Sequence, residues 1–250
     1  MNSKNILIIY AHPDDESFGN AGTIVKYTKE TQANIYLAVA TRGEAGKMGE
    51  PPLTTREQLG SFRAGELKEA SAVLGLKDIF FLDFMDGTLD RINDREADEL
   101  TNKIADVILQ LRPDIVITFP EDGISRHKDH IAIHKYCMDA IALIANQYTI
   151  PKVYFTVVPE SIYQSRNITA GVPDTHITTS INIEEYRNYK YEALTKHRTQ
   201  IFSVNKVYPG LLDSKNLSLI YPFEYYQLIK LHGNDVDVTT YREKDLYDHL

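Results

Sequence analysis

The sequence predicts an α/β fold of three layers, in which a mostly parallel, Rossmann-like sheet lies between helices and carries its active site at the carboxyl ends of the strands. Short apolar runs such as residues 6–10 suit strands that are covered on both faces. They alternate with longer segments whose apolar residues recur at helical spacing, as at 94–111. A histidine and three acids closely follow the first strand, at the sheet edge where ligands bind in such folds.

The predicted elements alternate along the chain. In order they are a strand at 6–10, a helix at 22–30, a strand at 34–40, a helix at 55–74, a strand at 78–84, a helix at 94–111, a strand at 115–119, a helix at 131–145, a strand at 152–158 and a helix at 184–197. Thr55 is suited to cap the helix at 55–74 and Gly75 to end it. The segment at 159–180 is predicted to be rich in loops, and the aromatic run at 221–228 is expected in the core and the wall of the cleft.

Length and composition indicate a compact enzyme. The chain has 250 residues, of which 43% are hydrophobic and 25% charged. This is enough for one sizeable core, and we expect a single domain over 1–250. A formal charge of −8 and a pI near 5.5 argue against nucleic-acid partners, which bind to clustered Lys and Arg. The sequence therefore predicts a small-molecule substrate and no nucleic-acid partner.

The cysteine count and the apolar runs indicate the compartment. Cys137 is the only cysteine, so it forms no intramolecular disulfide and no thiolate zinc site, and we expect it in the apolar core. The N-terminal residues lack the apolar stretch of a signal peptide, and no run of about 18 apolar residues predicts a membrane span. We therefore expect a cytoplasmic protein without a membrane span. A homo-oligomer is compatible with these features.

Two clusters of metal-binding residue types follow predicted strands. In the first, His12 stands three residues before Asp15, so an imidazole nitrogen and a carboxylate oxygen can reach one zinc ion, which accepts both at about 2.0–2.2 Å. Pro13 favours a rigid turn that keeps their offset. A third ligand is expected from the second cluster, SRHKDH at 125–130, which follows the strand at 115–119 and so lies at the same rim. A catalytic zinc with three protein ligands keeps its fourth position for water.

Three sequence blocks resemble the PIG-L/LmbE-like family of zinc-dependent N-deacetylases. They are AHPDDESFGNAGT at 11–23, TRGEAG at 41–46 and HKDH at 127–130, and the likeness covers roughly residues 5–134. Members of that family typically remove acetyl from N-acetylglucosamine-containing compounds, including precursors of the thiols mycothiol and bacillithiol. The resemblance implies a hydrolase that uses metal-activated water to remove the N-acetyl group of such an amino-sugar substrate.

The resemblance also implies a ligand set for one Zn²⁺ per chain. His12, Asp15 and His130 match the metal ligands of the family. His134 competes with them, because it stands four residues after His130 on one helix face, as in a zincin pair. A zincin has Glu directly after its first histidine, whereas this chain has Ile131, so His130 is preferred.

The same blocks imply the catalytic residues. Asp14 matches the general base that takes a proton from water. His127 matches the histidine that assists catalysis, as a protonated group that faces the oxyanion and then protonates the leaving amine. Asp129 matches the carboxylate that orients this ring. Where the family commonly has proline, this chain has Lys128, which loses a conformational restraint but no side chain that takes part in the chemistry.

Three further residues are implied near the substrate, each with a structural alternative. Arg56 matches an arginine placed near the sugar or its aglycone, although an isolated arginine is also a common surface ion-pair partner. Asp86 matches an acid that points at the sugar, and the Asp-Gly pair that it begins is a turn signal as well. His197 lines the pocket or caps the preceding helix. The glycine-rich loop at 41–52 is expected to form part of the substrate cleft.

Four other charged residues are predicted to have structural roles. Arg63, Glu66 and Glu69 are expected on the solvent face of the helix at 55–74. Glu16 is expected to favour a helix start through the helix dipole.

Two other functions use the same fold or the same residues. A dinucleotide-dependent oxidoreductase needs G-x-G-x-x-G after the first strand and an acid at the end of the second. The chain instead has GNAG at 19–22 and Thr41-Arg42, so it meets neither condition well. A non-catalytic metal or sugar binder has no use for Asp14, which the metal does not need.

Overall fold

The structure, a computed structural model, describes residues 3–164 and 171–250, so residues 165–170 of the predicted loop-rich segment lie outside it. The strands are β1 (Asn5–Tyr10), β2 (Asn34–Thr41), β3 (Asp78–Phe84), β4 (Ile115–Thr118), β5 (Lys152–Val157), β6 (Thr179–Asn182), β7 (Phe223–Leu231) and β8 (Asn234–Asp235). The α-helices are α1 (Asp15–Gly19), α2 (Ala21–Glu30), α3 (Leu59–Leu74), α4 (Asp94–Leu111), α5 (Gly123–Arg126), α6 (Lys128–Leu143), α7 (Glu160–Gln164), α8 (Arg187–Lys196), α9 (Ile201–Val207) and α10 (Leu211–Ser214). Short 3-10 helices are η1 (Leu89–Arg91), η2 (Asp174–His176), η3 (Glu184–Tyr186), η4 (Arg198–Gln200) and η5 (Leu217–Leu219).

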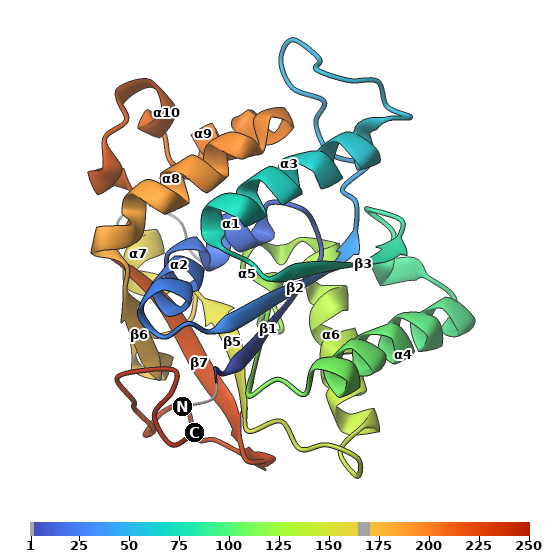
Figure 1. Ribbon diagram of the computed structural model, residues 1–250, viewed down its shortest axis with the longest axis vertical. Coiled ribbons are helices and arrows are strands. Elements are labelled where there is room, and N and C mark those ends of the chain that lie inside the picture. The colour runs from blue at the N-terminus through green and yellow to red at the C-terminus, as the bar shows by residue number, and fades with distance from the viewer. Residues whose placement is uncertain (1–2, 165–170) are drawn as a thin grey trace.

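The strands of the described residues form one mixed sheet in the order β3-β2-β1-β4-β5-β7-β6, with β8 paired to β7 (Figure 1). Strands β1 to β5 are parallel, and β7 runs antiparallel between β5 and β6. The chain moves outward from β1 through β2 to β3 and then returns to β4 on the other side of β1. This reversal creates a crevice at the carboxyl ends of β1 and β4, where ligands bind in open α/β sheets.

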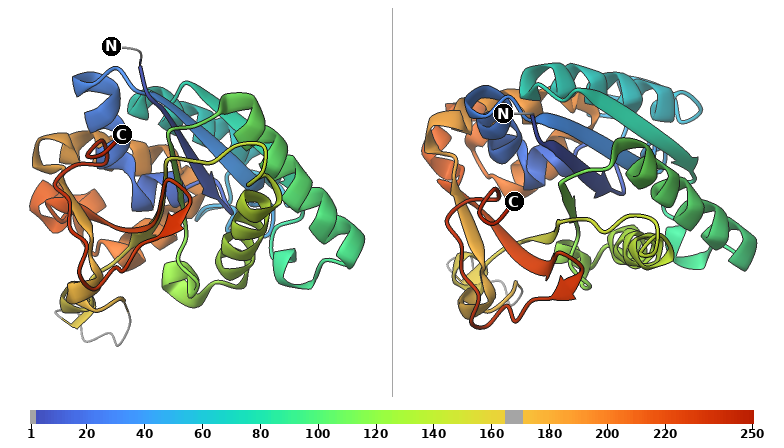
Figure 2. Two further views of the ribbon diagram at one scale, coloured as in Figure 1. Left: turned by 90° about the horizontal axis from the view of Figure 1, so that it is seen from below. Right: turned by 60° about the horizontal axis from the view of Figure 1, so that its bottom comes forward.

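Helices cover both faces of the sheet (Figures 1 and 2). α2, α3 and α8 pack against one another on one face, and α4 packs against α6 on the other. The central strand β1 lies deep in the core, where Ile6 to Tyr10 are at most 1% exposed. The predicted three-layer α/β class is therefore confirmed. Cys137 of α6 is fully buried in this core, and burial raises the pKa of its thiol to about 12.

Most predicted elements are present, with boundaries shifted by a few residues. α3 begins at Leu59, so the prediction that Thr55 caps it is wrong, whereas Gly75 ends it in a left-handed conformation as expected. α6 begins at Lys128, three residues earlier than predicted, because the side chain of His127 caps it. The predicted helix at 184–197 is divided into η3 and α8.

The C-terminal strands β6 and β7 were not predicted from the sequence. The aromatic run at 221–228 enters β7, where Tyr226 and Leu228 are fully buried. A core position is therefore confirmed for these two residues. The buried acid Glu224, which pairs with Lys190 of α8, interrupts the apolar pattern that would have indicated an inner strand. Within the described residues, every helix is too short or too polar to cross a bilayer.

Candidate active site

The two clusters of metal-binding residue types meet at the strand reversal. His12 directly follows the turn out of β1, and its backbone N–H donates to the carboxylate of Asp15 at 2.8 Å. His130 comes from the first turn of α6, which follows the neighbouring strand β4. His12 and Asp15 are 7% and 8% exposed. Side chains more than a hundred positions apart in the sequence are thus brought into direct contact.

Four atoms of His12, Asp15 and His130, three residues that we call the triangle, converge at this point. Nδ1 of His12 is 3.2 Å from Nε2 of His130 and 3.6 Å from Oδ2 of Asp15, while Oδ1 of Asp15 is 3.2 Å from Nε2 of His130. Zinc bonds of about 2.0–2.2 Å in a tetrahedral site place ligand atoms about 3.3–3.6 Å apart. The distance between the two rings, and the distance from each ring to one oxygen of Asp15, are therefore close to those between neighbouring ligands in such a site.

The second ring nitrogen of each histidine faces an acceptor. Nε2 of His12 lies 3.0 Å from Oδ1 of Asp86 and 3.2 Å from Oδ2 of Asp129. Nδ1 of His130 lies 3.1 Å from the carbonyl oxygen of Gly123. These nitrogens carry the ring protons, so in the neutral rings the lone pairs point at the centre of the triangle. Fixing a ligand histidine through its outer nitrogen is the usual way in which proteins orient metal sites, and the donor set therefore fits a zinc ion.

Two overlapping groups of possible ligands also contain His12. Its ring and the rings of His127 and His130 form one group, and its ring with Asp86 and Asp129 forms the other. The carboxylates of the second group already accept hydrogen bonds from backbone N–H groups, that of Asp86 from Ala45 at 2.9 Å. They lie on the outer nitrogen of His12, so they orient this ring rather than complete the triangle.

The charges around the triangle are unbalanced without a cation. Burial alone would lower the pKa of His12, but hydrogen bonds to Asp129 and Asp86 and the nearby charge of Asp15 raise it to about 10. Burial would raise the pKa of Asp15, but the rings of His130 and His12 hold it well below its usual range. A bound cation would take the place of the proton on His12.

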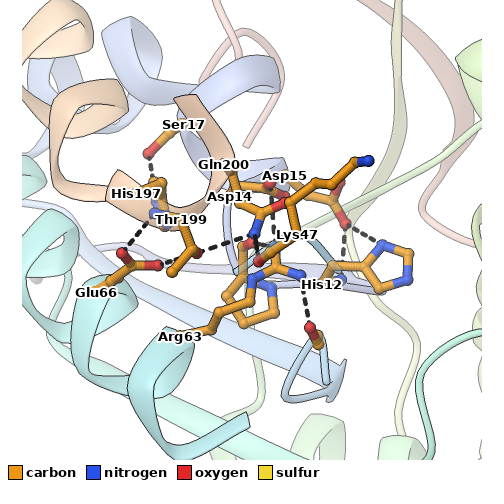
Figure 3. Close-up of polar contacts among 12 residues, drawn as sticks. His12, Asp14, Asp15, Ser17, Lys47, Arg63, Glu66, His197, Thr199 and Gln200 are labelled. Carbon is orange, nitrogen blue, oxygen red and sulfur yellow. Dashed lines mark hydrogen bonds and ion pairs between the residues drawn. The ribbon is translucent and has the colours of Figure 1, made fainter. Parts of the chain in front are cut away.

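Asp14 lies beside the triangle and is held by Arg63 of α3 (Figure 3). Nη2 of Arg63 donates to Oδ2 of Asp14 at 3.2 Å and to the carbonyl oxygen of Pro13, and Nη1 donates to the carbonyl oxygen of Gly43 at 2.8 Å. Burial raises the pKa of Asp14 to about 6, against the opposing charge of Arg63. Gly43 is required here, because a Cβ atom would lie 2.1 Å from Nη1 of Arg63.

His127 lies next to the triangle as the N-cap residue of α6. Its Nδ1 accepts the backbone N–H of Asp129 at 3.2 Å, so the single proton of the neutral ring is on Nε2. Burial lowers the pKa of this ring, and the neighbouring rings of His12 and His130 lower it further. The geometry therefore favours a neutral His127.

The expected pairing of the Asp129 carboxylate with the ring of His127 is wrong. This carboxylate is fully buried and accepts the N–H groups of Gly87 at 2.6 Å and Leu89 at 3.1 Å, besides its contact with His12. Its position in the first turn of α6 directs it toward the loop after β3, away from the ring that caps the same turn. Asp129 therefore orients His12 and anchors the β3 loop.

The residues implied near the substrate have different positions. Asp86 is 9% exposed and contacts His12, and the hydrogen bond from that ring outweighs burial to lower the pKa of Asp86 to about 2. Arg56 is exposed, and its Nη1 donates to the carbonyl oxygens of Glu44 at 2.7 Å and Gly46 at 2.8 Å. Arg56 thus ties down the glycine-rich loop and leaves the rest of its guanidinium toward solvent.

His197 is buried behind the site. Its ring is fully buried, and Nε2 lies 2.9 Å from Oε1 of Glu16 and 3.3 Å from Oγ of Ser17. The residue follows α8 at the C-cap position, but its ring bonds to Glu16. A direct substrate contact of His197 is therefore not possible in this structure. Glu16 is also fully buried, and it lies in the first turn of α1, at the helix start predicted for it.

Two charged residues of α3 lie on the buried face of the helix, although the sequence analysis predicts them on the solvent face. Arg63 is 3% exposed, and Glu66 is fully buried where its carboxylate accepts both the N–H and the hydroxyl of Thr199 (Figure 3). Glu69 is exposed, as predicted. The spacing contained the signal, because Arg63 stands four residues after the apolar Leu59 and so lies on the buried face of the helix.

Comparison with known proteins places this chain among deacetylases. The family model described as PIG-L, GlcNAc-PI de-N-acetylase, matches residues 7–141. A 1D-myo-inositol 2-acetamido-2-deoxy-alpha-D-glucopyranoside deacetylase of Thermomonospora curvata is 30% identical over 271 residues, with 90% of each chain covered. A Bacillus anthracis protein described as a probable N-acetyl-alpha-D-glucosaminyl L-malate deacetylase 2 is 34% identical over 200 residues, which cover 80% of this chain and 82% of the relative.

Solved structures share the fold. The N,N'-diacetylchitobiose deacetylase of Pyrococcus horikoshii superposes with a TM-score of 0.66 at 17% sequence identity, over 100% of this chain and 90% of the other. A conserved protein of Thermus thermophilus, TT1542, superposes with a TM-score of 0.63 at 22% identity, over 92% and 96% of the two chains. At such identities these likenesses show the architecture alone.

Proposed function

The chain belongs to the PIG-L family of de-N-acetylases, and from this premise we propose that it is a zinc-dependent hydrolase that removes the N-acetyl group from an N-acetylglucosamine-containing small molecule. The observation that carries the proposal is the triangle of His12, Asp15 and His130, whose lone pairs converge at the spacing of zinc ligands. One Zn²⁺ per chain would be held there.

Asp14 is the proposed general base. Zinc held by the triangle would supply a water with a pKa lowered to about 7 and a positive charge beside the amide oxygen. Arg63 holds one oxygen of Asp14, and Oδ1 has no hydrogen-bond partner among the described residues. Burial raises the pKa of Asp14 to about 6 in the metal-free protein, so its carboxylate is ionised at neutral pH and can take the proton of the attacking water.

His127 is the proposed hydrogen-bond donor to the amide oxygen. Because its Nδ1 accepts the N–H of Asp129, the neutral ring presents an N–H at Nε2, and a positioned donor of this kind is worth about 3–4 kcal/mol as negative charge develops. The lowered pKa of His127 argues against the protonated ring that the sequence suggests. The proton that Asp14 takes from water then passes to the amine nitrogen as the C–N bond breaks.

The curated relatives indicate which substrates to test. One is named for a glucosamine joined to inositol and another for a glucosamine joined to malate, so the shared part is the N-acetylated glucosamine. The proposed substrate of this chain is a soluble conjugate of the same kind. Contacts of Asp86 and Arg56 with the sugar stay predictions, supported by their places beside His12 and on the glycine-rich loop.

The test is zinc analysis combined with an amine-release assay on N-acetylglucosaminyl inositol and N-acetylglucosaminyl malate. We expect one zinc per chain, and release of amine from at least one conjugate. Asp14→Asn should keep the zinc and lose about 10²–10⁴-fold in kcat, the usual contribution of a general base. Asp139→Asn, a matched change at an exposed residue of α6, should change neither. Wild-type protein that binds zinc but releases no amine from either conjugate would contradict the proposal.

A further inference from the structure

The backbone of Asp14 has an unusual conformation that needs support. Its φ is 118°, in the region that favours glycine, and as the N-cap residue of α1 it makes no capping hydrogen bond with its own side chain. Non-glycine residues keep such angles only where surrounding contacts impose them. In this chain the contacts come from two sides, and Arg63 supplies one of them by holding the Asp14 carboxylate and the carbonyl of Pro13.

The second side is a carboxylate two residues later in the chain. Oε2 of Glu16 accepts the backbone N–H of Asp14 at 3.0 Å. Oε1 of the same carboxylate accepts the hydroxyl of Ser17 at 2.6 Å and lies 2.9 Å from Nε2 of His197. The two oxygens therefore have separate roles. Oε2 holds the backbone at Asp14, and the contacts of Oε1 hold the Glu16 carboxylate itself in place.

His197 reaches this carboxylate from the far part of the chain. The side chains of His197 and Glu16 are both fully buried, and 181 positions separate them in the sequence. A buried carboxylate with no partner is costly, so the ring of His197, 2.9 Å from Oε1, supplies a partner that holds the Glu16 carboxylate in place. A pair that only attached α8 to α1 would not need the second bond, from Oε2 to the Asp14 backbone.

We propose that Glu16 and His197 form a buried positioning pair, which holds the backbone of Asp14 so that its carboxylate faces the attacking water. The inference rests on the proposed role of Asp14 as general base. Neither residue touches the substrate, and both act through Asp14. The C-terminal half of the chain thereby controls the geometry of a site whose other residues come from the first 130 positions.

The test compares Glu16→Ala with Glu16→Gln in the zinc-loaded enzyme. Glu16→Ala removes the acceptor of the Asp14 N–H, and we expect kcat to fall about 100-fold, because displacement of a catalytic group by about 1 Å has effects of this size. KM should change less than about twofold and zinc content should not change. Glu16→Gln keeps an oxygen that accepts this N–H, so we expect it to recover most of the lost kcat.

The control is Glu243→Gln, which alters another fully buried carboxylate, paired with Lys152 at the amino end of β5. It should lower stability and leave kcat within about twofold of the wild type. If Glu16→Ala does not fold, His197→Ala gives the same kcat and KM comparison, because it frees the Glu16 carboxylate to turn. Equal losses in Glu16→Ala and Glu16→Gln would overturn the proposed hydrogen bond as the cause.

A crystal structure of the zinc-loaded Glu16→Ala variant separates this inference from the proposed function. We expect φ of Asp14 to leave the positive region when its N–H loses the acceptor. This readout needs no turnover, so it is decisive even if the wild-type enzyme releases no amine from the conjugates tested. An unchanged positive φ, or a kcat within twofold of the wild type, would overturn the positioning role.

Discussion

Two clusters of buried charge lie at opposite ends of the sheet. In one, which we call the closed cluster, the positive and negative charges balance. In the other, the open cluster, they do not. At the amino end of β5, the buried ammonium of Lys152 donates to Oε2 of Glu243 at 2.7 Å and to the carbonyl oxygens of Leu246 at 3.0 Å and Asp248 at 2.8 Å. One cation meets one carboxylate, and three acceptors surround the ammonium. This cluster ties the C-terminal segment to the sheet.

At the carboxyl ends of β1 and β4, the balance is different. Four carboxylates lie here with one guanidinium, which contacts only one of them, and a proton on His12 supplies further positive charge, as its pKa of about 10 indicates. The carboxylates belong to Asp14, Asp15, Asp86 and Asp129, and the guanidinium to Arg63. A buried charge therefore indicates function when its neighbours leave it uncompensated. A closed pair indicates a structural role instead.

The strongest test of this contrast removes a ligand from the open cluster. We expect His130→Ala to lose zinc and more than about 1,000-fold of the deacetylase activity, because the ion provides both the acidified water and several kcal/mol of charge stabilisation. Zinc should stabilise the wild type by about 4 kcal/mol at 1,000 times its Kd and should not stabilise the variant. Metal analysis, amine release and thermal unfolding with and without zinc measure these effects.

His134→Ala is the matched control, because this ring lies one helical turn further along α6 and its Nδ1–H donates to the carbonyl oxygen of Phe119 at 2.9 Å. It should keep its zinc. Retention of zinc by His130→Ala together with loss by His134→Ala would assign the site to the other histidine.

The closed cluster should respond in stability alone. Lys152→Met leaves the buried carboxylate of Glu243 without its cation, and breaking a buried pair in this way costs about 3–5 kcal/mol of unfolding free energy. Denaturant unfolding measures this loss, and kcat per folded molecule should stay within about twofold of the wild type. A variant with full stability, or one with a selective loss of kcat, would remove the distinction between the two clusters.

The sequence is informative where spacing along one loop or one helix decides the outcome. The turn at His12–Asp15 and a second histidine cluster after another strand were enough to predict that the two clusters meet, because parallel strands end at the same rim. The family resemblance was needed to select His130 as the third ligand. The position of Arg63 was equally open to prediction from the apolar period of α3. The pairing of Glu16 with His197 was not, because 181 positions separate the two residues and nothing in either segment specifies that α8 packs against α1.

The role of Asp129 shows a second limit. Its sequence neighbour His127 is a natural partner for a carboxylate, but the helix start at Lys128 turns the two side chains to different sides. Which side chain points where in a first helical turn depends on the cap, and the cap depends on a boundary that sequence patterns locate only to within a few residues.

Asp129 contacts the outer ring nitrogen of His12, Nε2, and we expect its substitution to have an effect of intermediate size on zinc binding. Asp129→Asn keeps the shape but weakens the acceptor of the His12 N–H, so we expect zinc affinity to fall about 10–100-fold, as for other residues that orient a ligand histidine. Competition with a chromophoric chelator measures this change. Asp90→Asn, at the exposed residue that pairs with Lys128, is the control and should leave the affinity unchanged.

The smallest expected effect is a pH dependence of zinc affinity, which tests whether zinc replaces a proton on His12. Burial opposes this proton, but the surrounding carboxylates raise the pKa of His12 to about 10 in the metal-free protein, so below that pH the proton and zinc compete for the ring. Zinc affinity should therefore rise about tenfold per pH unit between about pH 6 and 9. Calorimetric titrations in buffers of different ionisation heat should detect at least one proton released per zinc at pH 7. If the affinity were independent of pH over this range, the ring of His12 would carry no proton for zinc to displace, and the idea that zinc replaces this charge would be wrong.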